Sequence, residues 1–374
     1  MAARDAVRAV AMVAGMATAC CSAGAQIAAD EVAFRARLAA DYLVSVQLPS
    51  GLFAYEYDFL AARLVEADSI VRQAGTAFGV ALFLNRWDAP GYRPYAERAL
   101  RALVAYSMPY DDGIVVATGD DLADAPAGAT ALALLAELNY VEATGNNGFA
   151  EARAAWARAL ASLQRPDGGF ASTPASDTRS PYYDGETWLA FAHLRRLFPE
   201  DAVADEVLAK ADEGLMRAYG DAPDTAFFQW GLMAAAVRYE TTGDERFRDF
   251  IARQSEAFLT DLRPRVSPAN NGCAVVEGLA AASSLLVASG PDDLRQRIAT
   301  RIDAELTKSL AFQIMPGQGQ ISLGDQRYLV DPEIARFAGA VLNGRYQSRT
   351  RIDSTVHCLS ALTMYASMRR ALTR

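Results

Sequence analysis

The sequence predicts an all-α fold, an (α/α)6 toroid, in which six helical hairpins form an inner and an outer ring of helices. Three observations predict it. Two classes of helical segment alternate along the chain, a Pro/Gly turn of one type follows several segments of the first class, and no half of the chain is rich in strand-forming sequence. We therefore expect a single toroid domain over residues 27–374.

The first class of segment is amphipathic. Apolar residues recur at i, i+3, i+4 and i+7 in runs that begin near residues 29, 91, 148, 201, 244 and 292. Arg, Glu and Asp occupy the other face, as in "EVAFRARLAADYLVSV". Because such a helix buries one face and exposes the other, we assign this class to the outer ring.

The second class is rich in Ala and Leu and poor in charge. Its members are "VRQAGTAFGVALFL", "DAPAGATALALLAELNYV", "YYDGETWLAFAHLRRL", "DTAFFQWGLMAAAVRYE", "NNGCAVVEGLAAASSLLV" and "STVHCLSALTMYASM". A helix that is apolar nearly all round is buried on both sides, which predicts the inner ring. Hairpins that cannot bury their own apolar faces must stack on one another. A closed ring leaves no exposed end, whereas an open α-solenoid, the alternative, leaves two.

The turn "QRPDGGF" (164–170) follows an outer segment, and related phrases recur at the same place in the pattern. They are "QLPSGLF" (47–53), "MPYDDGIV" (108–115) and "QIMPGQGQI" (313–321). Each contains Pro or Gly, which stops a helix, and an apolar residue that we expect to dock the loop. Residues 314–349 form an irregular insertion, which we expect to cross one mouth of the toroid.

Composition excludes some partners. The chain has 374 residues, of which 52% are hydrophobic, and a formal net charge of -9 without a basic stripe. This balance suits a globular protein with a large core and argues against nucleic acid and anionic membranes as main partners.

The first 25 residues are typical of a secretory signal peptide. Arg4 and Arg8 precede the apolar run "AVAMVAGMATACC", and "AGA" before Gln26 supplies a small-residue cleavage site. The run is too short for stable insertion across a bilayer. We therefore expect a periplasmic or secreted protein; lipoprotein anchoring at Cys20 is the alternative. Cleavage leaves Cys273 and Cys358, which export permits to pair.

The functional site is expected at the mouth where the inner helices begin, since their N-termini and preceding loops converge there and favour anionic groups. Residues with acid, base or nucleophilic chemistry near these starts are Asp58, Asp121, Asp184, Glu186, Asp353 and His357. Asp184 and Glu186 are two apart at a helix start and point in different directions, so one of them at most is the acid or base. Asp353 and His357 are four apart on one helical face, where a carboxylate can orient an imidazole. Asp120, Asp124 and Asp224 are more simply explained as helix caps.

Other residues near the same mouth suit substrate binding. Glu277 interrupts an Ala/Leu helix and needs a partner or a raised pKa. Arg72 and Gln73 open a buried helix, where a structural ion pair competes with ligand contact as their role. Aromatic rings provide platforms for sugars, although inner-helix aromatics also build core. The full set is Tyr57, Arg72, Gln73, Tyr183, Trp188, Trp230, Asn271, Glu277 and Arg351.

Two resemblances follow from these patterns. The repeated "Q-x-x-D-G-x-aromatic" phrase resembles the QW motif of terpene-cyclase-type toroids, and the alternating hairpins resemble six-hairpin glycosidases and related polysaccharide lyases. The likeness covers the whole chain after residue 26 as architecture. The cyclases' "DxDD" signature and the "RGNGW" phrase of unsaturated uronyl hydrolases are absent. The resemblance therefore implies a class of site and leaves the reaction open.

We expect an exported carbohydrate-active enzyme that cleaves a glycosidic bond with two carboxyl groups and no cofactor. The expected pair is Asp184 or Glu186 with Asp58, Asp121 or Asp353. A polysaccharide lyase would use His357 or a Tyr as base and Arg351 or Asn271 to neutralise a uronate. A zinc enzyme like the lanthionine cyclases would use Cys273, His357 and Cys358. A non-catalytic glycan-binding toroid is the remaining alternative, and the oligomeric state stays open.

Overall fold

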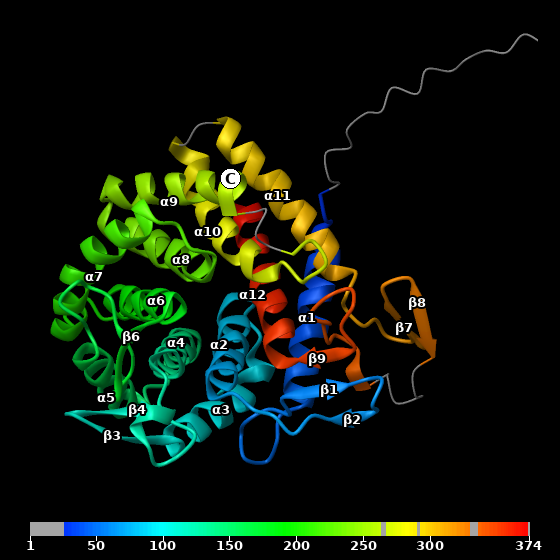
Figure 1. Cartoon of the computed structure of the whole chain (residues 1–374), viewed down its shortest axis with the longest axis horizontal. Helices are drawn as coiled ribbons and strands as arrows, with labels where there is room; N and C mark the ends of the chain where they lie inside the picture. Colours follow the sequence, from blue (N-terminus) through cyan, green and yellow to red (C-terminus); the bar gives the residue numbers. More distant parts are fainter. Residues whose placement is uncertain (1–25, 263–266, 290–291, 330–335, 373–374) are drawn as a thin grey trace, which may run out of the picture.

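The computed structural model describes residues 26–262, 267–289, 292–329 and 336–372, and the predicted signal peptide lies outside these ranges. The described residues form twelve α-helices in two concentric rings (Figure 1). The outer ring consists of α1 (Ala29–Ser45), α3 (Arg93–Ala105), α5 (Ala150–Ser162), α7 (Ala202–Asp221), α9 (Glu245–Ala257) and α11 (Asp292–Leu310). The inner ring consists of α2 (Ile70–Arg86), α4 (Ala127–Thr144), α6 (Pro181–Leu197), α8 (Thr225–Thr242), α10 (Cys273–Ser289) and α12 (Ile352–Leu372).

The ring is closed. Each inner helix contacts the next one along the chain, and α12 contacts both α10 and α2. The predicted (α/α)6 toroid is therefore confirmed, and the open solenoid is wrong. Helix starts expected near residues 29, 148, 201, 244 and 292 agree with the structure to within two residues. The segment expected from residue 91 begins with a short 3-10 turn, η1 (Pro90–Tyr92), before α3.

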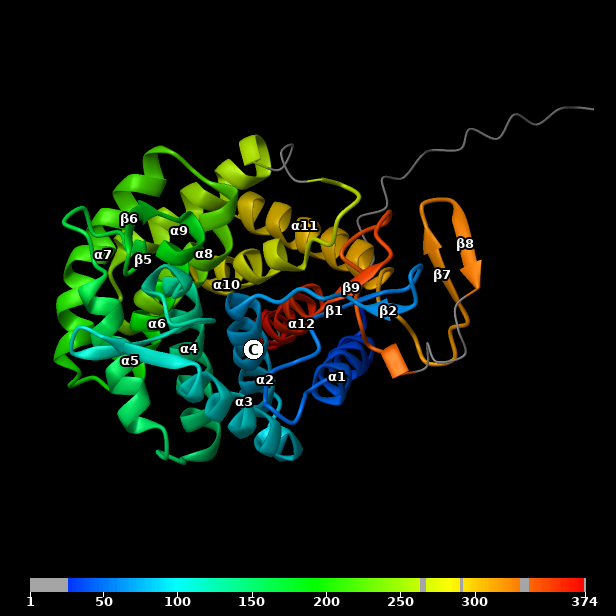
Figure 2. The same cartoon turned by 60° about the horizontal axis from the view of Figure 1, so that its bottom comes forward.

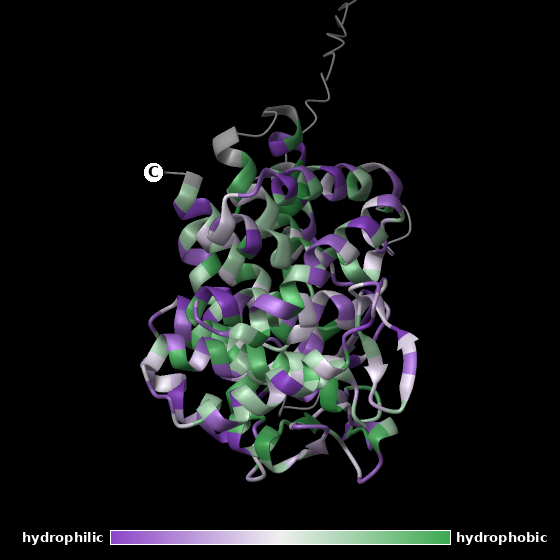
Figure 3. Ribbon diagram, turned by 90° about the vertical axis from the view of Figure 1, so that its left-hand side faces the viewer, coloured by the Kyte–Doolittle hydropathy of each residue, from purple (hydrophilic) through white to green (hydrophobic). Residues whose placement is uncertain are grey.

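Helices of the inner ring are apolar on more faces than helices of the outer ring. α4 buries residues on every face from Ala127 to Tyr140, whereas α9 buries one stripe that includes Phe247, Phe250 and Ile251. Figure 3 shows hydrophobic residues concentrated in the interior and hydrophilic residues more along the outside. No helix of the described residues is long and apolar enough to cross a membrane.

Glutamine side chains at the ends of three outer helices explain the recurring turn phrase. Gln47 after α1 donates from Nε2 to the carbonyl oxygen of Tyr95 in α3, 3.0 Å away. Gln164 after α5 donates to that of Val207 in α7 at 2.8 Å. Gln313 after α11 donates to the carbonyl of Arg35 in α1 at 3.0 Å, which joins the last outer helix to the first. The phrase lies at the turn after an outer helix, as predicted, and its glutamine also clamps neighbouring outer helices, which was not predicted.

Glycines let these turns approach the next outer helix. Gly51 and Gly168 have positive φ angles of 94° and 88°. A Cβ on Gly168 would overlap the carbonyl oxygen of Lys210 in α7. The aromatic residue that ends the phrase, Phe170, is fully buried, as expected for a side chain that docks the loop.

Short antiparallel strand pairs, which the sequence did not indicate, follow the outer helices α3, α5 and α11. They are β3 (Ser107–Tyr110) with β4 (Gly113–Val116), β5 (Ala171–Thr173) with β6 (Ser176–Arg179), and β7 (Gln320–Leu323) with β8 (Gln326–Leu329). A three-stranded sheet in the order β2-β1-β9 contains β1 (Glu56–Asp58), β2 (Arg63–Leu64) and β9 (Arg349–Arg351). It pairs the loop before α2 with the loop before α12.

The insertion over residues 314–349 does not lie where we expected it. Figures 1 and 2 both show the β7–β8 hairpin at the edge of the molecule, away from the centre of the ring. The later part of the insertion runs back toward the inner helices, where the backbone N–H of Arg345 donates to Ala269 and that of Phe59 donates to Ser348. This part therefore borders the mouth of the ring.

Candidate active site

A cavity of about 450 Å³ opens where the inner helices begin. We call it the N-terminal cavity. All six inner helices contribute to its wall, together with Arg351 of β9. Its polar and aromatic lining includes Arg72, Tyr182, Tyr183, Glu186, Gln229, Trp230, Glu277, Arg351, Asp353 and His357. The cavity thus lies at the mouth where the sequence pattern predicts a functional site.

Glu186, in the second turn of α6, has the most unusual environment in this cavity. The residue is 4% exposed, and its Oε2 atom has no hydrogen-bond partner among the described residues. Burial raises the pKa of its carboxyl group to about 8, although the nearby charge of His357 acts in the opposite direction. The group is therefore mostly protonated at neutral pH, and it can donate a proton to a molecule in the cavity.

Glu277 and His357 form a pair across the ring. Nδ1 of His357 in α12 lies 3.1 Å from Oε2 of Glu277 in α10. Gln229 of α8 donates a hydrogen bond to the same carboxylate oxygen. Burial raises the pKa of Glu277, against the opposing effects of His357 and Gln229. Burial alone would lower the pKa of His357, but the neighbouring acids, Glu277 above all, together outweigh it and raise that pKa above its usual value.

Asp353 holds two arginines at the edge of the cavity. Its carboxylate accepts two hydrogen bonds of 2.9 Å from Arg351 and forms a 2.9 Å ion pair with Nε of Arg72. Arg72 also donates to the hydroxyl of Tyr55. The expected contact between Asp353 and His357 is not the one formed, because the arginines occupy Asp353 while the imidazole faces Glu277. Arg72 therefore makes the structural ion pair that was one of its two predicted roles, and it also lines the cavity, where it can contact a ligand.

Aromatic rings line the outer part of the cavity. Tyr182 is exposed, Tyr183 is half-buried, and the ring centroid of Trp230 lies 6.3 Å from that of His357. Two glycines allow this packing. A Cβ on Gly128 of α4 would overlap the carboxyl of Glu186 and press on Tyr183, and one on Gly185 would lie 2.5 Å from the Cβ of Trp230.

The fold has known counterparts. The chain resembles an α-1,6-mannanase of Salegentibacter sp., with a TM-score of 0.65 and 11% identity over 90% of this chain and 99% of that one. An unsaturated glucuronyl hydrolase specific for heparin gives 0.61 and 12% over 92% and 99%. A sugar epimerase from a ruminal bacterium gives 0.63 and 11% over 90% and 98%. The chain shares their (α/α)6-toroid fold. No protein-family model and no curated protein sequence matches it.

Asp184 and Trp188, which neighbour Glu186 in sequence, lie outside the N-terminal cavity. Asp184 points the other way, as its spacing from Glu186 predicts, and it is fully buried. Its carboxylate accepts hydrogen bonds from the backbone N–H of Phe170 at 2.8 Å and from Tyr219 at 2.6 Å, and it pairs with Arg179. Asp184 therefore fastens the "QRPDGGF" turn to α6. Trp188 is a core residue whose Nε1 donates to Asp212 at 2.7 Å.

Four more residues of the predicted set also lie away from the cavity wall. Asp58 accepts from Ser348 at 2.9 Å and pairs with Arg349. Asp121 caps the short helix η2 (Leu122–Asp124), as Asp224 caps α8. The side chain of Gln73 exchanges hydrogen bonds with the backbone of Phe53, so it supports the first turn. The ring of Tyr57 packs against Phe337, with centroids 4.4 Å apart.

Cys273 and Cys358 are joined by a disulfide between α10 and α12. Because both sulfur atoms are bonded to each other, they are not thiolate ligands, and the proposed Cys–His–Cys zinc site is wrong. Asn271 lies beside this link: Nδ2 donates to the carbonyl of Ser354 at 3.1 Å, and Oδ1 accepts from the backbone N–H of Cys273 at 2.8 Å. Its place is between the two helices, next to the cavity wall.

Sequence reasoning missed how two of these residues would work. Glu277 was grouped with the substrate-binding residues and expected to need a partner or a raised pKa, but its partner, His357, was not foreseen. Gln229 opens an inner helix but was not selected, and it holds Glu277. The signal for Glu277 was an acid within a run of Ala, Val, Gly and Leu. No signal in the sequence indicates which residue of another helix that acid would meet.

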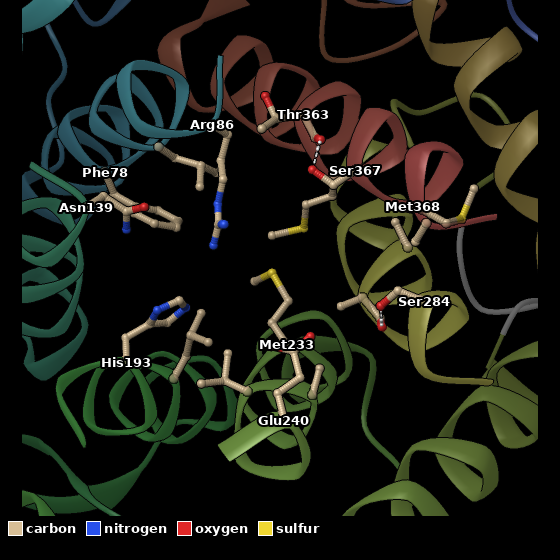
Figure 4. Close-up of a pocket in the computed structure, with 18 residues that line it drawn as sticks. Phe78, Arg86, Asn139, His193, Met233, Glu240, Ser284, Thr363, Ser367 and Met368 are labelled. Carbon is tan, nitrogen blue, oxygen red and sulfur yellow. Dashed lines mark hydrogen bonds between the residues drawn. The ribbon is translucent and has the colours of Figure 1, made fainter. Parts of the chain in front are cut away.

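A second cavity, of about 310 Å³, lies toward the opposite end of the ring, where the inner helices end. Figure 4 shows Arg86, His193 and Met233 converging on it from three helices. Burial and the neighbouring Arg196 lower the pKa of His193 to about 3, so the imidazole is neutral near pH 7. Among the described residues that line this cavity, the charged ones are Arg86 and Glu240, and both are exposed. It therefore lacks the buried carboxyl groups of the N-terminal cavity.

Proposed function

We propose that the protein is an exported carbohydrate-active enzyme that hydrolyses a glycosidic bond in a poly- or oligosaccharide at the N-terminal cavity. The observation that carries this proposal is Glu186, a buried carboxyl group in the cavity wall with an oxygen that no group in the described part of the chain hydrogen-bonds. Buried polar atoms are normally paired, so an unpaired one in a cavity indicates a bound ligand or a reaction. The shared fold with proteins named as a mannanase and a glucuronyl hydrolase supports a glycan as the ligand.

Glu186 is the general acid in this scheme. With a pKa of about 8, it carries a proton at neutral pH and donates it to the glycosidic oxygen as the bond to the anomeric carbon breaks. The leaving sugar departs with a hydroxyl group, and Glu186 is left ionised. Proton exchange with solvent then restores the acid.

Glu277 is the base. Its raised pKa makes it a stronger base than an ordinary carboxylate, while His357 and Gln229 fix its orientation. A water molecule gives one proton to Glu277, and its oxygen forms the new bond to the anomeric carbon. Glu186 and Glu277 stand on α6 and α10, two helices apart in the inner ring, so a sugar can lie between them.

The other residues of the cavity wall would bind the substrate. The rings of Tyr182, Tyr183 and Trp230 offer apolar faces to sugars, and Arg72 and Arg351 provide hydrogen-bond donors. A cavity of about 450 Å³ is within the size range of small-molecule sites, which suits one end of a glycan chain. Export is supported by the leader-like N-terminus and by the disulfide, since disulfides persist in oxidising compartments.

The test is turnover of a panel of bacterial and plant glycans by protein that begins at residue 26, with Glu186→Gln and Glu277→Gln as variants. Each variant should lower kcat by at least about a hundredfold, with an unchanged helical circular dichroism spectrum. Activity of the wild type should fall as the pH rises through about 8, because Glu186 then loses its proton. Asp184→Asn is the matched control, and it should lower thermal stability without a selective loss of kcat. Full activity in Glu186→Gln would refute the assignment.

A lyase acting on a uronate is the second candidate, favoured by the two guanidinium groups at the edge of the same cavity. There, Arg351 would neutralise the carboxylate of the sugar, and Tyr183 or His357 would remove the adjacent proton. Its product carries a double bond that absorbs ultraviolet light, whereas hydrolysis yields a reducing end and no such absorbance. The same panel of glycans therefore separates the two reactions.

A further inference from the structure

The disulfide lies one helical turn from the Glu277–His357 pair. Cys273 is the first residue of α10, and Glu277 follows four residues later on the same face. On α12, His357 directly precedes Cys358. Both sulfur-bearing residues are fully buried. The covalent link and the acid–imidazole contact thus join the same two helices at nearly the same height.

Most of the residues that follow Cys273 in α10 are apolar: they are Ala, Val, Val, Gly, Leu and Ala, with Glu277 among them. Apolar contacts have no directional preference. A hydrogen bond such as the 3.1 Å contact between Glu277 and His357 fails with a shift of less than about 1 Å. Asn271 adds directional contacts, since it bridges the start of α10 to the carbonyl of Ser354 and the Sγ atom of Cys358.

We propose that the Cys273–Cys358 disulfide, assisted by Asn271, positions Glu277 against His357, so that the cavity acquires its acid–imidazole pair only when the cysteines are oxidised. Oxidation removes two electrons and two protons from the two thiols and passes them to a disulfide oxidant of the compartment, which becomes two thiols. The inference deepens the proposed function and depends on it only for the measurement of activity. Before export, the reduced chain would lack the pair and hence full activity.

The chain itself provides a direct measurement. It contains two histidines, and the low pKa of His193, about 3, keeps its imidazole from titrating near neutral pH. The imidazole titration seen by nuclear magnetic resonance near and above pH 6.5 therefore belongs to His357. The acidic groups that act most on it are Glu277 from α10, Asp353 on its own helix and Glu186 from α6. The neighbouring α8 contributes the uncharged Gln229 and Trp230, and Arg72 of α2 is paired with Asp353.

The experiment compares the oxidised protein with Cys273→Ala/Cys358→Ala and with protein reduced by a phosphine and then reoxidised. We expect the pKa of His357 to fall by at least about one unit when the link is absent, and to return on reoxidation. With a glycan substrate, kcat should fall at least about tenfold while KM changes less than about twofold. Tyr365→Phe is the matched control, because it removes a 2.7 Å bond between α12 and Asp303 of α11 away from the cavity. It should lower the Tm and leave the His357 titration unchanged.

The proposal fails if the double variant melts at a lower temperature but His357 titrates as in the oxidised protein, since the disulfide would then only stabilise the fold. Asn271→Ala, which keeps the disulfide, decides the matter if the double variant does not fold. The Asn271→Ala variant should lower the pKa of His357 by less than the double variant does. An unchanged His357 titration in this variant overturns the proposal. If no glycan is turned over by the wild type, the proposed function fails, whereas the titration still tests the positioning role.

Discussion

Burying the side chain of Glu186 lowers the stability of the folded protein. Its carboxyl group is buried against Gly128 and the ring of Tyr183, yet one oxygen lacks a partner. A buried acid in this condition keeps its proton and destabilises the folded state whenever the solvent would remove that proton. Sites that bind or react commonly contain such groups, and stability measurements reveal them without any substrate.

Replacing Glu186 with Gln should therefore stabilise the protein at alkaline pH. The folded protein holds this proton up to about pH 8, whereas the unfolded chain releases it near 4.5. The folded state thus binds more protons than the unfolded state between these values, and stability falls as the pH rises through this window. We expect Glu186→Gln to be more stable than the wild type by about 1 to 4 kcal/mol at pH 8 and nearly equal at pH 4.5. Urea unfolding at the two pH values measures this, and equal differences at both would contradict the raised pKa.

Gly128 of α4 should tolerate no side chain. A methyl group there would overlap the Glu186 carboxyl and press on Tyr183, so Gly128→Ala should cost about 1 to 3 kcal/mol of stability and displace the acid. The control is Gly75→Ala on α2, where the nearest atom to the new Cβ is Leu132 Cδ1 at 3.7 Å. This change should be neutral or stabilise by up to about 1 kcal/mol. Chemical denaturation of both variants measures their free energies of unfolding. Equal losses of stability would mean that Gly128 has no special role.

At the level of helices and turns, the clamp between outer helices depends on backbone conformation as much as on glutamine. Gly168 combines a positive φ with a close approach to α7, whereas Gly145 has a positive φ of 65° and open space around it. A substitution at Gly145 therefore tests only the cost of a side chain in the left-handed backbone conformation. The same substitution at Gly168 adds the cost of overlap with α7.

Gly168→Ala should destabilise the protein by at least about 2 kcal/mol more than Gly145→Ala. Both variants incur the left-handed backbone penalty of about 1 kcal/mol, but only the first also forces the turn away from Lys210 and Gly214 of α7. Thermal unfolding of the pair measures the difference. Similar Tm values would show that the turn does not dock as tightly as the structure indicates.

The helices were predictable from sequence because their signals are long and local. α8 and α9 are examples. α8 is apolar all round, begins after a capping aspartate and ends at a glycine. α9 has a single apolar stripe and also begins after a capping aspartate. The strand pairs were not predictable, since β5 and β6 span only three and four residues and owe their pairing to the turn between them. Within the site, the spacing of Asp353 and His357 suggested that they would be partners. Asp353 instead pairs with Arg351, two residues earlier, and with Arg72 of α2, and the imidazole of His357 meets Glu277 of α10. Spacing along one helix cannot reveal such partners.

For the whole molecule, closure of the ring should make folding depend on the first helix. α1 packs on α12 and accepts the hydrogen bond of Gln313, so it completes the outer ring and covers the last helix of the inner ring. We expect a chain that begins at residue 47, without α1, to lose cooperative unfolding, whereas one that begins at residue 26 unfolds in a single transition. Calorimetry of the two proteins tests this expectation. A cooperative transition in the shorter chain would show that five hairpins suffice.

The hydroxyl of Tyr365, near the end of α12, lies beside the backbone of Ile27, just before α1. The first and last described segments are therefore neighbours, and the order in which the hairpins follow one another along the chain is not what holds the ring together. A short linker between these two segments, with new ends opened in the exposed loop at Gly145, would give a circular permutant whose chain starts in the third hairpin. The position of a hairpin in the gene and its position in the ring are thus separable properties of this protein.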